Sequence, residues 1–446
     1  MVDYSPFSAN DSKWARAEFA ALCDFGARAK TSVGFGSLDA DGEVDEAAGR
    51  QLWINCRMTH VFALAAELGS TRGKELAEYG IQALNQLFYD PDFGGFYSAL
   101  DGFGTPIPES GERKEGYAHA FVLLAACSGR LAGIAGAEQL YRRAIAAHEE
   151  HFWDTTVGLT RESWNREFTE TEDYRGANAN MHTVEAMLAA WDVSAETRWL
   201  SRSLGVIRFI FTQSEKLSWR IGEHFTRDWE FLPDYNRERP ADPFRPFGAT
   251  PGHGLEWSRL ALQTWAAIAA LPSQTRTGIL SEAQYPVQSW THLPEIAYKV
   301  FSRAVSDGWS SGANGQAPGI VYTTDFSGKP VVRQRMHWTI CEGIDAAAVF
   351  ARYFQQIGDT SRTNECERLL VELCEYARHF LIEQPGHWRH ELDENNLPNA
   401  ATWPGKPDIY HAAQAMLMPI MPLTPCFTKA LSLRQDRADL LRNAKP

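Results

Sequence analysis

Side chains able to exchange protons or bind hydroxyl groups recur in this sequence shortly after its long connecting segments. They form six groups: Trp53 with Arg57, Tyr117 with His119, Asn178 with His182, His253 with Glu256, His337 with Trp338 and Glu342, and Asp408 with His411. Histidine has an unperturbed pKa of about 6.5, so it can act as a base and then as an acid near neutral pH. These groups predict proton-transfer chemistry on a small polar ligand, provided that the fold brings them together.

The elements that must position these side chains are helices. Apolar residues at i, i+3 and i+4 predict twelve helical segments. They are 12–29, 47–68, 74–89, 114–127, 137–151, 177–192, 196–214, 252–270, 277–308, 335–357, 362–383 and 408–419. Short turns alternate with long Gly-, Pro- and aromatic-rich connections, and connections of that length are usually functional or disordered. Six hairpins of this kind fit an all-α fold, an (α/α)6 barrel with the long loops covering one mouth.

Alternate helices of such a barrel line its interior and should be apolar nearly all round. Segment 47–68 has that character, whereas segment 137–151 resembles an outer helix. Inner helices run the same way, so their N-termini should converge on one mouth and create a positive field there. Thr250-Pro251 is a strong start signal for the helix bearing His253, and Pro407 is expected to start the helix bearing His411.

Composition favours one large enzyme-like domain, residues 1–446. The net charge of −13 disfavours a nucleic-acid partner, which would need a basic face. The seven cysteines are odd in number and form no CxxC pair, which favours reduced thiols. The N-terminus has no apolar run typical of a signal sequence, and no stretch approaches the roughly 20 apolar residues that span a bilayer. We therefore expect a cytoplasmic protein without a membrane partner.

No metal or cofactor is predicted. His253-x-x-Glu256 places two possible ligands on one helical face, but it lacks the HExxH pattern and a nearby third ligand. The sequence also contains no Walker A motif and no GxGxxG motif between a strand and a helix. Arg57 lies in an apolar helix, where it could pair with a buried carboxylate or with a polar ligand. The remaining histidines are interpreted as structural: His60, His119, His148, His151, His224, His292, His379, His387 and His390.

Five motifs resemble those of the N-acylglucosamine 2-epimerase superfamily, most closely its aldose–ketose isomerase branch. They are Arg57-Met58-Thr59-His60-Val61-Phe62, Asn178-x-x-x-His182-x-x-Glu185-Ala186, His253-Gly254-Leu255-Glu256-Trp257, Trp338-x-x-x-Glu342 and Gly405-Lys406-Pro407-Asp408-Ile409-Tyr410-His411. The resemblance spans residues from about 50 to 414. Its motifs are specific in combination and weak singly.

The resemblance implies an (α/α)6 barrel with a sugar in its central cleft, no obligatory metal, and His253 and His411 as the catalytic pair. It also implies that Glu256 orients His253. The other substrate-binding residues that it implies are Trp53, Arg57, Tyr117, Asn178, His182, Trp338, Glu342 and Asp408.

The expected reaction is interconversion of D-mannose and D-fructose through an enediolate, with D-lyxose as a related substrate. Alternatives within the superfamily are a 2-epimerase acting on cellobiose or N-acylglucosamine, and an isomerase of sulfoquinovose. A more remote alternative is an (α/α)6 glycosidase, which would need two carboxylates such as Glu256 and Asp408. An α-solenoid scaffold is disfavoured because the long loops are unequal. The sequence does not decide between a monomer and a homodimer.

Overall fold

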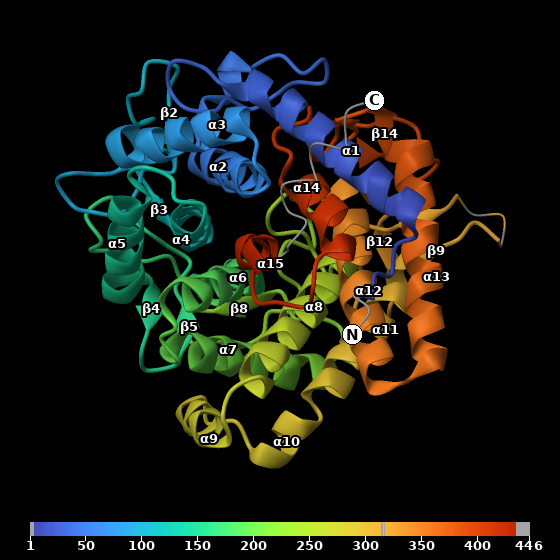
Figure 1. Cartoon of the computed structure of the whole chain (residues 1–446). Helices are drawn as coiled ribbons and strands as arrows, with labels where there is room; N and C mark the ends of the chain where they lie inside the picture. Colours follow the sequence, from blue (N-terminus) through green and yellow to red (C-terminus); the bar gives the residue numbers. More distant parts are fainter. Residues whose placement is uncertain (1–3, 314, 316, 434–446) are drawn as a thin grey trace.

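The helices form two concentric layers (Figure 1), in a computed structural model that describes residues 4–313, 315 and 317–433. The inner helices are α2 (Leu52–Glu67), α4 (Gly116–Leu131), α6 (Ala177–Ser194), α8 (Pro251–Ala269), α12 (His337–Ile357) and α14 (Tyr410–Leu417). The outer helices are α3 (Thr71–Ala83), α5 (Ala137–Ala147), α7 (Arg198–Lys216), α11 (Leu293–Gly308), α13 (Thr360–Tyr376) and α1 (Ala9–Gly26). Each inner helix contacts the next, and α14 contacts both α12 and α2, so the ring closes. Each inner helix also packs on one outer helix, which gives the predicted (α/α)6 barrel.

Burial separates the two layers as the sequence predicted. Every residue of α2 from Leu52 to Ala65 is buried, because neighbouring helices cover it on all sides. In α5 the buried residues follow a single stripe: Ala137, Leu140, Tyr141, Ala144 and Ala147. The opposite face of α5 is left to solvent, as expected for an outer helix.

The long connections fold into a repeated β structure, with one copy ahead of each inner helix. The short strand that precedes an inner helix pairs antiparallel with a strand of the following connection. Four such pairs are β1 (Arg50–Gln51) with β2 (Ala99–Leu100), β3 (Lys114–Glu115) with β6 (Ser163–Trp164), β7 (Tyr174–Gly176) with β8 (His224–Thr226), and β13 (Arg335–Met336) with β16 (Glu391–Leu392). The other two junctions are a bridge from Ala249 to Thr324 and a hydrogen bond from Lys406 N to Leu38 O. Six junctions thus join the connections into a closed rim.

Four further strand pairs lie within single connections. They are β4 (Trp153–Asp154) with β5 (Leu159–Thr160), β9 (Trp309–Ser310) with β10 (Gly319–Ile320), β11 (Thr323–Thr324) with β12 (Pro330–Val332), and β14 (Ile382–Gln384) with β15 (His387–Trp388).

A side-chain oxygen closes the tip of each connection. Asp101 Oδ1 accepts hydrogen bonds from the backbone N–H groups of Phe103 and Thr105, both at 2.9 Å. The equivalent acceptors are Asp39, Asn165, Thr226, Asp325 and Asp393. At each turn, the oxygen of a short polar side chain accepts the hydrogen bonds of backbone N–H groups that have no backbone carbonyl as a partner. They explain how long polar loops can be ordered around the mouth.

The C-terminal segment covers the other end of the barrel. Helix α15 (Phe427–Leu433) contacts α2 and α4 and lies near the centre of the ring in Figure 1. Cys426 N donates to Asp192 near the end of α6, and Gln263 Nε2 donates to Thr424 O. The tail beyond residue 433, which the sequence left without a role, lies outside the described residues.

Three predicted helix boundaries were wrong. The segment predicted to begin at residue 47 begins at Leu52, after β1. The segment predicted as one helix, 277–308, is divided among α9 (Ser273–Glu282), α10 (Val287–Thr291) and α11. Pro286 is the N-cap of α10 and Pro294 lies in the first turn of α11, where proline lacks the N–H that a continuous helix needs. Helix α14 begins at Tyr410 rather than at Pro407, and Asp408 Oδ1 accepts from Tyr410 N at 2.8 Å. The start at Pro251 is confirmed.

All seven cysteines are free thiols, and only Cys23 is not fully buried. Among the described residues, we find no helix that combines the length and the apolar character needed to cross a bilayer.

Candidate active site

The side chains singled out from the sequence occupy equivalent positions on the inner helices. The second residues of these helices are Trp53, Tyr117, Asn178, Gly252, Trp338 and His411. The sixth residues are Arg57, Phe121, His182, Glu256, Glu342 and Ala415. Residues four apart share one face of a helix, so the two rows line the same end of the barrel. His253 is the third residue of α8, so it directly follows Gly252, the residue that occupies the second position of that helix.

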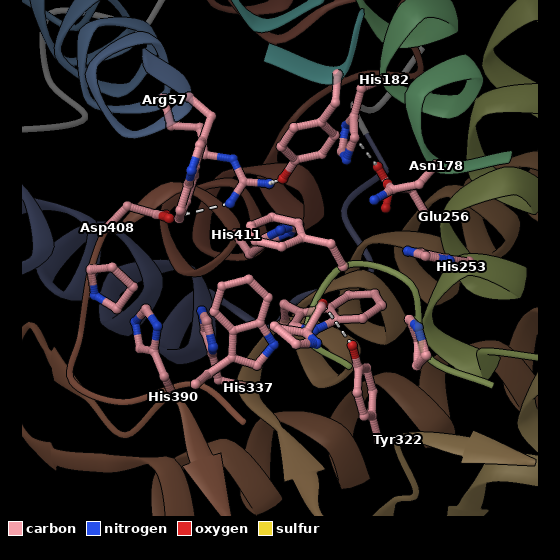
Figure 2. Close-up of a pocket in the computed structure, with 18 residues that line it drawn as sticks. Arg57, Asn178, His182, His253, Glu256, Tyr322, His337, His390, Asp408 and His411 are labelled. Atoms are coloured by element: carbon pink, nitrogen blue, oxygen red, sulfur yellow. Dashed lines mark hydrogen bonds and ion pairs between the residues drawn. The ribbon is translucent and has the colours of Figure 1, made fainter. Parts of the chain in front are cut away.

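These residues surround a pocket that encloses about 610 Å³ of space, part of it open to solvent (Figure 2). Of the residues predicted to bind substrate or to act in catalysis, all except Glu342 line it: Trp53, Arg57, Tyr117, Asn178, His182, His253, Glu256, Trp338, Asp408 and His411. Residues separated by more than 300 positions in the chain therefore share one site.

His411 is held by a buried carboxylate. Its Nδ1 lies 3.0 Å from Glu342 Oε1, and Glu342 Oε2 accepts from Arg259 Nη2 at 3.0 Å. An ionised carboxylate can only accept, so this bond assigns the proton of a neutral His411 to Nδ1 and leaves the Nε2 lone pair available. Burial, together with the charge of Arg57, lowers the pKa of His411 well below its ordinary value. His411 is thus a neutral base at pH 7. Glu342, expected to bind substrate hydroxyls, instead lies behind this histidine.

His253 is held by Glu223, not by Glu256 as the sequence predicted. The Glu223 carboxylate lies 3.0 and 3.1 Å from His253 Nδ1, and it also accepts from Thr250 N at 3.2 Å. Glu223 belongs to the segment just before β8, so no helical spacing could reveal this contact. Glu256 Oε1 instead lies 3.6 Å from His182 Nδ1 and 3.8 Å from Arg259 Nη2.

The two imidazoles both neighbour one indole, that of Trp338. The ring centroid of Trp338 is 5.1 Å from that of His253 and 5.9 Å from that of His411. Their separation therefore cannot exceed the sum of these two distances, and both rings line the same pocket. A single small molecule can touch both.

Arg57 is the only arginine or lysine among the residues that line this pocket. Its guanidinium donates to Asp408 Oδ2 at 3.2 Å and to the Tyr117 hydroxyl at 2.9 Å. It also lies over the rings of Phe121 and Tyr410, at 4.5 and 4.8 Å from their centroids. Burial disfavours its charge, but the surrounding acidic groups raise the pKa of Arg57 above its ordinary value. Its Nε has no hydrogen-bond partner, so a donor remains for a ligand.

A buried group of acids lies beneath the pocket. Burial and the nearby Glu342 raise the pKa of Glu256 well above its ordinary value. Both of its oxygens lack a hydrogen-bond partner. Glu185 accepts from the Tyr410 hydroxyl at 2.6 Å and faces His182 Nδ1 at 3.3 Å, and despite its burial these contacts lower the pKa of Glu185.

His182, Glu185 and Glu256 are the residues best placed to hold a metal ion, because one donor atom of each lies within 4.8 Å of the others. The contacts of this group oppose such a role. Arg259 lies beside Glu256, and both oxygens of Glu185 already accept a hydrogen bond from the Tyr410 hydroxyl. The expectation of a metal-free site stays a prediction.

The pocket also contains residues that the sequence did not indicate. The loop residues Phe244, Trp403 and Tyr322 form part of its wall, as do Pro243, Pro246 and Pro407. Phe244 lies edge-on to Trp403 with centroids 5.1 Å apart. His390, interpreted from the sequence as structural, lines the pocket as well. The aromatic content of the long connections was the one signal of these contributions.

The chain is similar to known proteins over most of its length. The family model described as N-acylglucosamine 2-epimerase matches residues 34–415. A D-mannose isomerase of Thermobifida fusca is 41% identical over 422 residues, covering 94% of this chain and 96% of the relative. A D-mannose isomerase of Pseudomonas cannabina pv. alisalensis is 40% identical, with 94% and 95% covered. A solved D-mannose isomerase structure superposes with a TM-score of 0.77 at 26% identity, covering 93% of this chain and 99% of the other.

Proposed function

Because this chain belongs to the N-acylglucosamine 2-epimerase family, we propose that it is a sugar isomerase that interconverts D-mannose and D-fructose. The observation that carries the proposal is the pair of imidazoles that line one pocket beside Trp338, each with Nδ1 on a buried carboxylate. Carboxylate partners of this kind orient an imidazole and stabilise its protonated form. Two such groups facing one ligand suit a reaction that moves two protons.

The proposed reaction begins with opening of the pyranose ring to the free aldehyde. His411 Nε2 removes the proton from C2, and the electron pair of that bond forms the C1–C2 double bond as the carbonyl electrons move to O1. The imidazolium of His411 then returns the proton to C1, while the electrons on O2 form the ketose carbonyl. His253 carries the complementary proton from O2 to O1 and assists ring opening. No oxidant or reductant is needed, because hydrogen moves only within the substrate and the two histidines.

The charges around the pocket support this chemistry. The low pKa of His411 keeps it neutral and able to accept a proton. Arg57 presents an unpartnered Nε, and the N-termini of the inner helices meet at the pocket, so both can stabilise the negative enediolate. Asn178 and His182 also line the pocket and suit the substrate hydroxyls, and Trp338 suits a face of the sugar.

The same charges favour an unmodified aldose over sulfoquinovose. The single lining cation, Arg57, is already paired with Asp408, and Pro407 has no side-chain donor for a sulfonate. Asp408 also accepts from Tyr410 N, which makes it a poor general acid for a glycosidase. A 2-epimerase would form the same enediolate and return the proton to C2, so the product must distinguish the two reactions.

The test is product analysis. The protein is incubated with D-mannose, D-glucose, D-lyxose, cellobiose and sulfoquinovose, and the products are identified by NMR. We expect fructose from mannose and xylulose from lyxose, with solvent deuterium at C1 or C2 if the shuttle exchanges with water. Formation of glucose from mannose without fructose would show that the protein is an epimerase rather than an isomerase. Formation of an epimer from cellobiose, with no product from the other sugars, would lead to the same conclusion.

We further propose that residues 1–446 form a single cytoplasmic domain. The ring closes only through α14, which needs α1 from the other end of the chain as its outer partner. Seven free thiols fit a reducing compartment.

A further inference from the structure

Two histidines of the pocket have no part in the proton transfers proposed above. His337 is the first residue of α12, and His390 directly precedes β16. Their rings stack with centroids 3.7 Å apart and planes inclined by 25°. Both line the pocket, and they are only 5% and 6% exposed. Both ring nitrogens of His337 are buried without a hydrogen-bond partner.

An unpartnered imidazole in a buried position is costly unless a ligand completes its hydrogen bonds. Burial lowers the pKa of His337 to about 4, and burial beside His337 lowers the pKa of His390 well below its ordinary value. Both rings are therefore neutral at pH 7. A neutral imidazole presents one donor and one acceptor, which matches a hydroxyl group, and it carries no positive charge to attract an anion.

Ring contacts place this pair at one end of a row that crosses the pocket. His253 neighbours Trp338 at 5.1 Å, Trp338 neighbours His411 at 5.9 Å, and His411 neighbours His337 at 6.2 Å. Figure 2 shows His253 on one side of His411 and the pair on the other. A sugar with C1 and C2 between His253 and His411 would extend past His411 toward the pair.

We infer that His337 and His390 bind the terminal hydroxymethyl group of the hexose and thereby favour six-carbon over five-carbon aldoses. This inference rests on the proposed isomerase function, since the placement of C1 and C2 comes from it. It assigns these two histidines to substrate specificity rather than to proton transfer.

The experiment compares three sugars. 6-Deoxy-D-mannose lacks only the oxygen on C6, and D-lyxose matches D-mannose from C1 to C4 but lacks the hydroxymethyl group. In the wild type we expect kcat/KM to fall roughly three- to tenfold from mannose to 6-deoxymannose, as for loss of a neutral hydrogen bond. His390→Phe keeps the stacked ring and removes both nitrogens, so it should lower kcat/KM for mannose by a similar factor. It should leave the values for 6-deoxymannose and lyxose within about twofold.

Two further variants complete the experiment. His390→Gln retains an amide that can bind a hydroxyl and should recover part of the preference for mannose, and it replaces His390→Phe if that protein does not fold. His60→Asn changes a buried histidine outside the pocket and should leave the ratio between the sugars unchanged.

Equal losses for all three sugars would show that the pair is structural and would overturn the inference. The same conclusion would follow if the wild type did not distinguish mannose from 6-deoxymannose. Absence of ketose from every sugar in the wild type would instead refute the isomerase proposal.

Discussion

Replacing Glu223 by glutamine should slow the reaction while leaving the fold intact. Glutamine keeps an oxygen that can accept from His253 Nδ1, now 3.0 Å from the carboxylate, but it removes the negative charge. Hydrogen bonds to charged groups contribute about 1.5–3 kcal/mol and neutral ones about 0.5–1.5 kcal/mol. The difference of about 1–1.5 kcal/mol would appear when His253 becomes protonated, which corresponds to a loss of roughly 5- to 13-fold in kcat.

Stability should separate this variant from its counterpart behind His411. Glu223 contacts a backbone N–H and His253, so we expect Glu223→Gln to change the free energy of unfolding by no more than about 1 kcal/mol. Glu342→Gln breaks an ion pair of 3.0 Å with Arg259, whose side chain is only 1% exposed. Loss of one partner of a buried pair costs about 3–5 kcal/mol. For 446 residues, at about 2.1 cal/mol/K per residue, the melting temperature should fall by about 3–5 °C.

The assay measures kcat for mannose together with calorimetric melting of both variants. Both should lose activity by similar factors, and only Glu342→Gln should melt earlier. If Glu223→Gln retained more than half of the wild-type kcat while Glu256→Gln lost activity, the assignment of Glu223 as the partner of His253 would be wrong.

Three other outcomes are expected. His253→Asn and His411→Asn should each fold and bind sugar but lose at least about 100-fold in kcat, the scale of general acid–base catalysis, and near-normal turnover in either would end its assignment. Dialysis against a chelator should leave kcat unchanged with no bound metal detected by mass spectrometry; a loss restored by a divalent ion would place a metal beside the pocket. Burial lowers the pKa of His60 to about 4, so its contribution to stability is present above pH 6.5 and is lost as the pH falls toward 4. His60→Asn should therefore flatten the acid side of the stability profile by up to about 3 kcal/mol, and parallel profiles would contradict this assignment.

The order of helices could be read from the sequence because each inner and outer helix has its own local periodicity. The division of segment 277–308 could not, since its apolar residues continue the helical pattern through Pro286 and Pro294. The rim strands were also missed. Each is two or three residues long and exists only because it pairs with another connection, as Arg50 does with Leu100.

The residues of the site also differ in whether the sequence could reveal them. Residues at a fixed helical position, such as Trp53 and His411, could be recognised because they follow a long loop and precede an apolar helix. Glu223 and His390 belong to the connections, and their roles depend on contacts with helices that lie elsewhere in the chain. Local pattern carries no information about such contacts.

Gly252 explains why His253 is the third residue of α8, whereas His411 is the second residue of α14. Gly252 occupies the second position of α8, and a Cβ there would lie 2.5 Å from the Trp338 ring and 2.8 Å from Thr339 Cγ2. A larger residue there would displace the indole, which neighbours both His253 and His411. With glycine at this position, the indole packs against α8 and His253 flanks it from the third position. Gly252 thus permits close packing of α8 against the Trp338 indole, beside which both His253 and His411 lie.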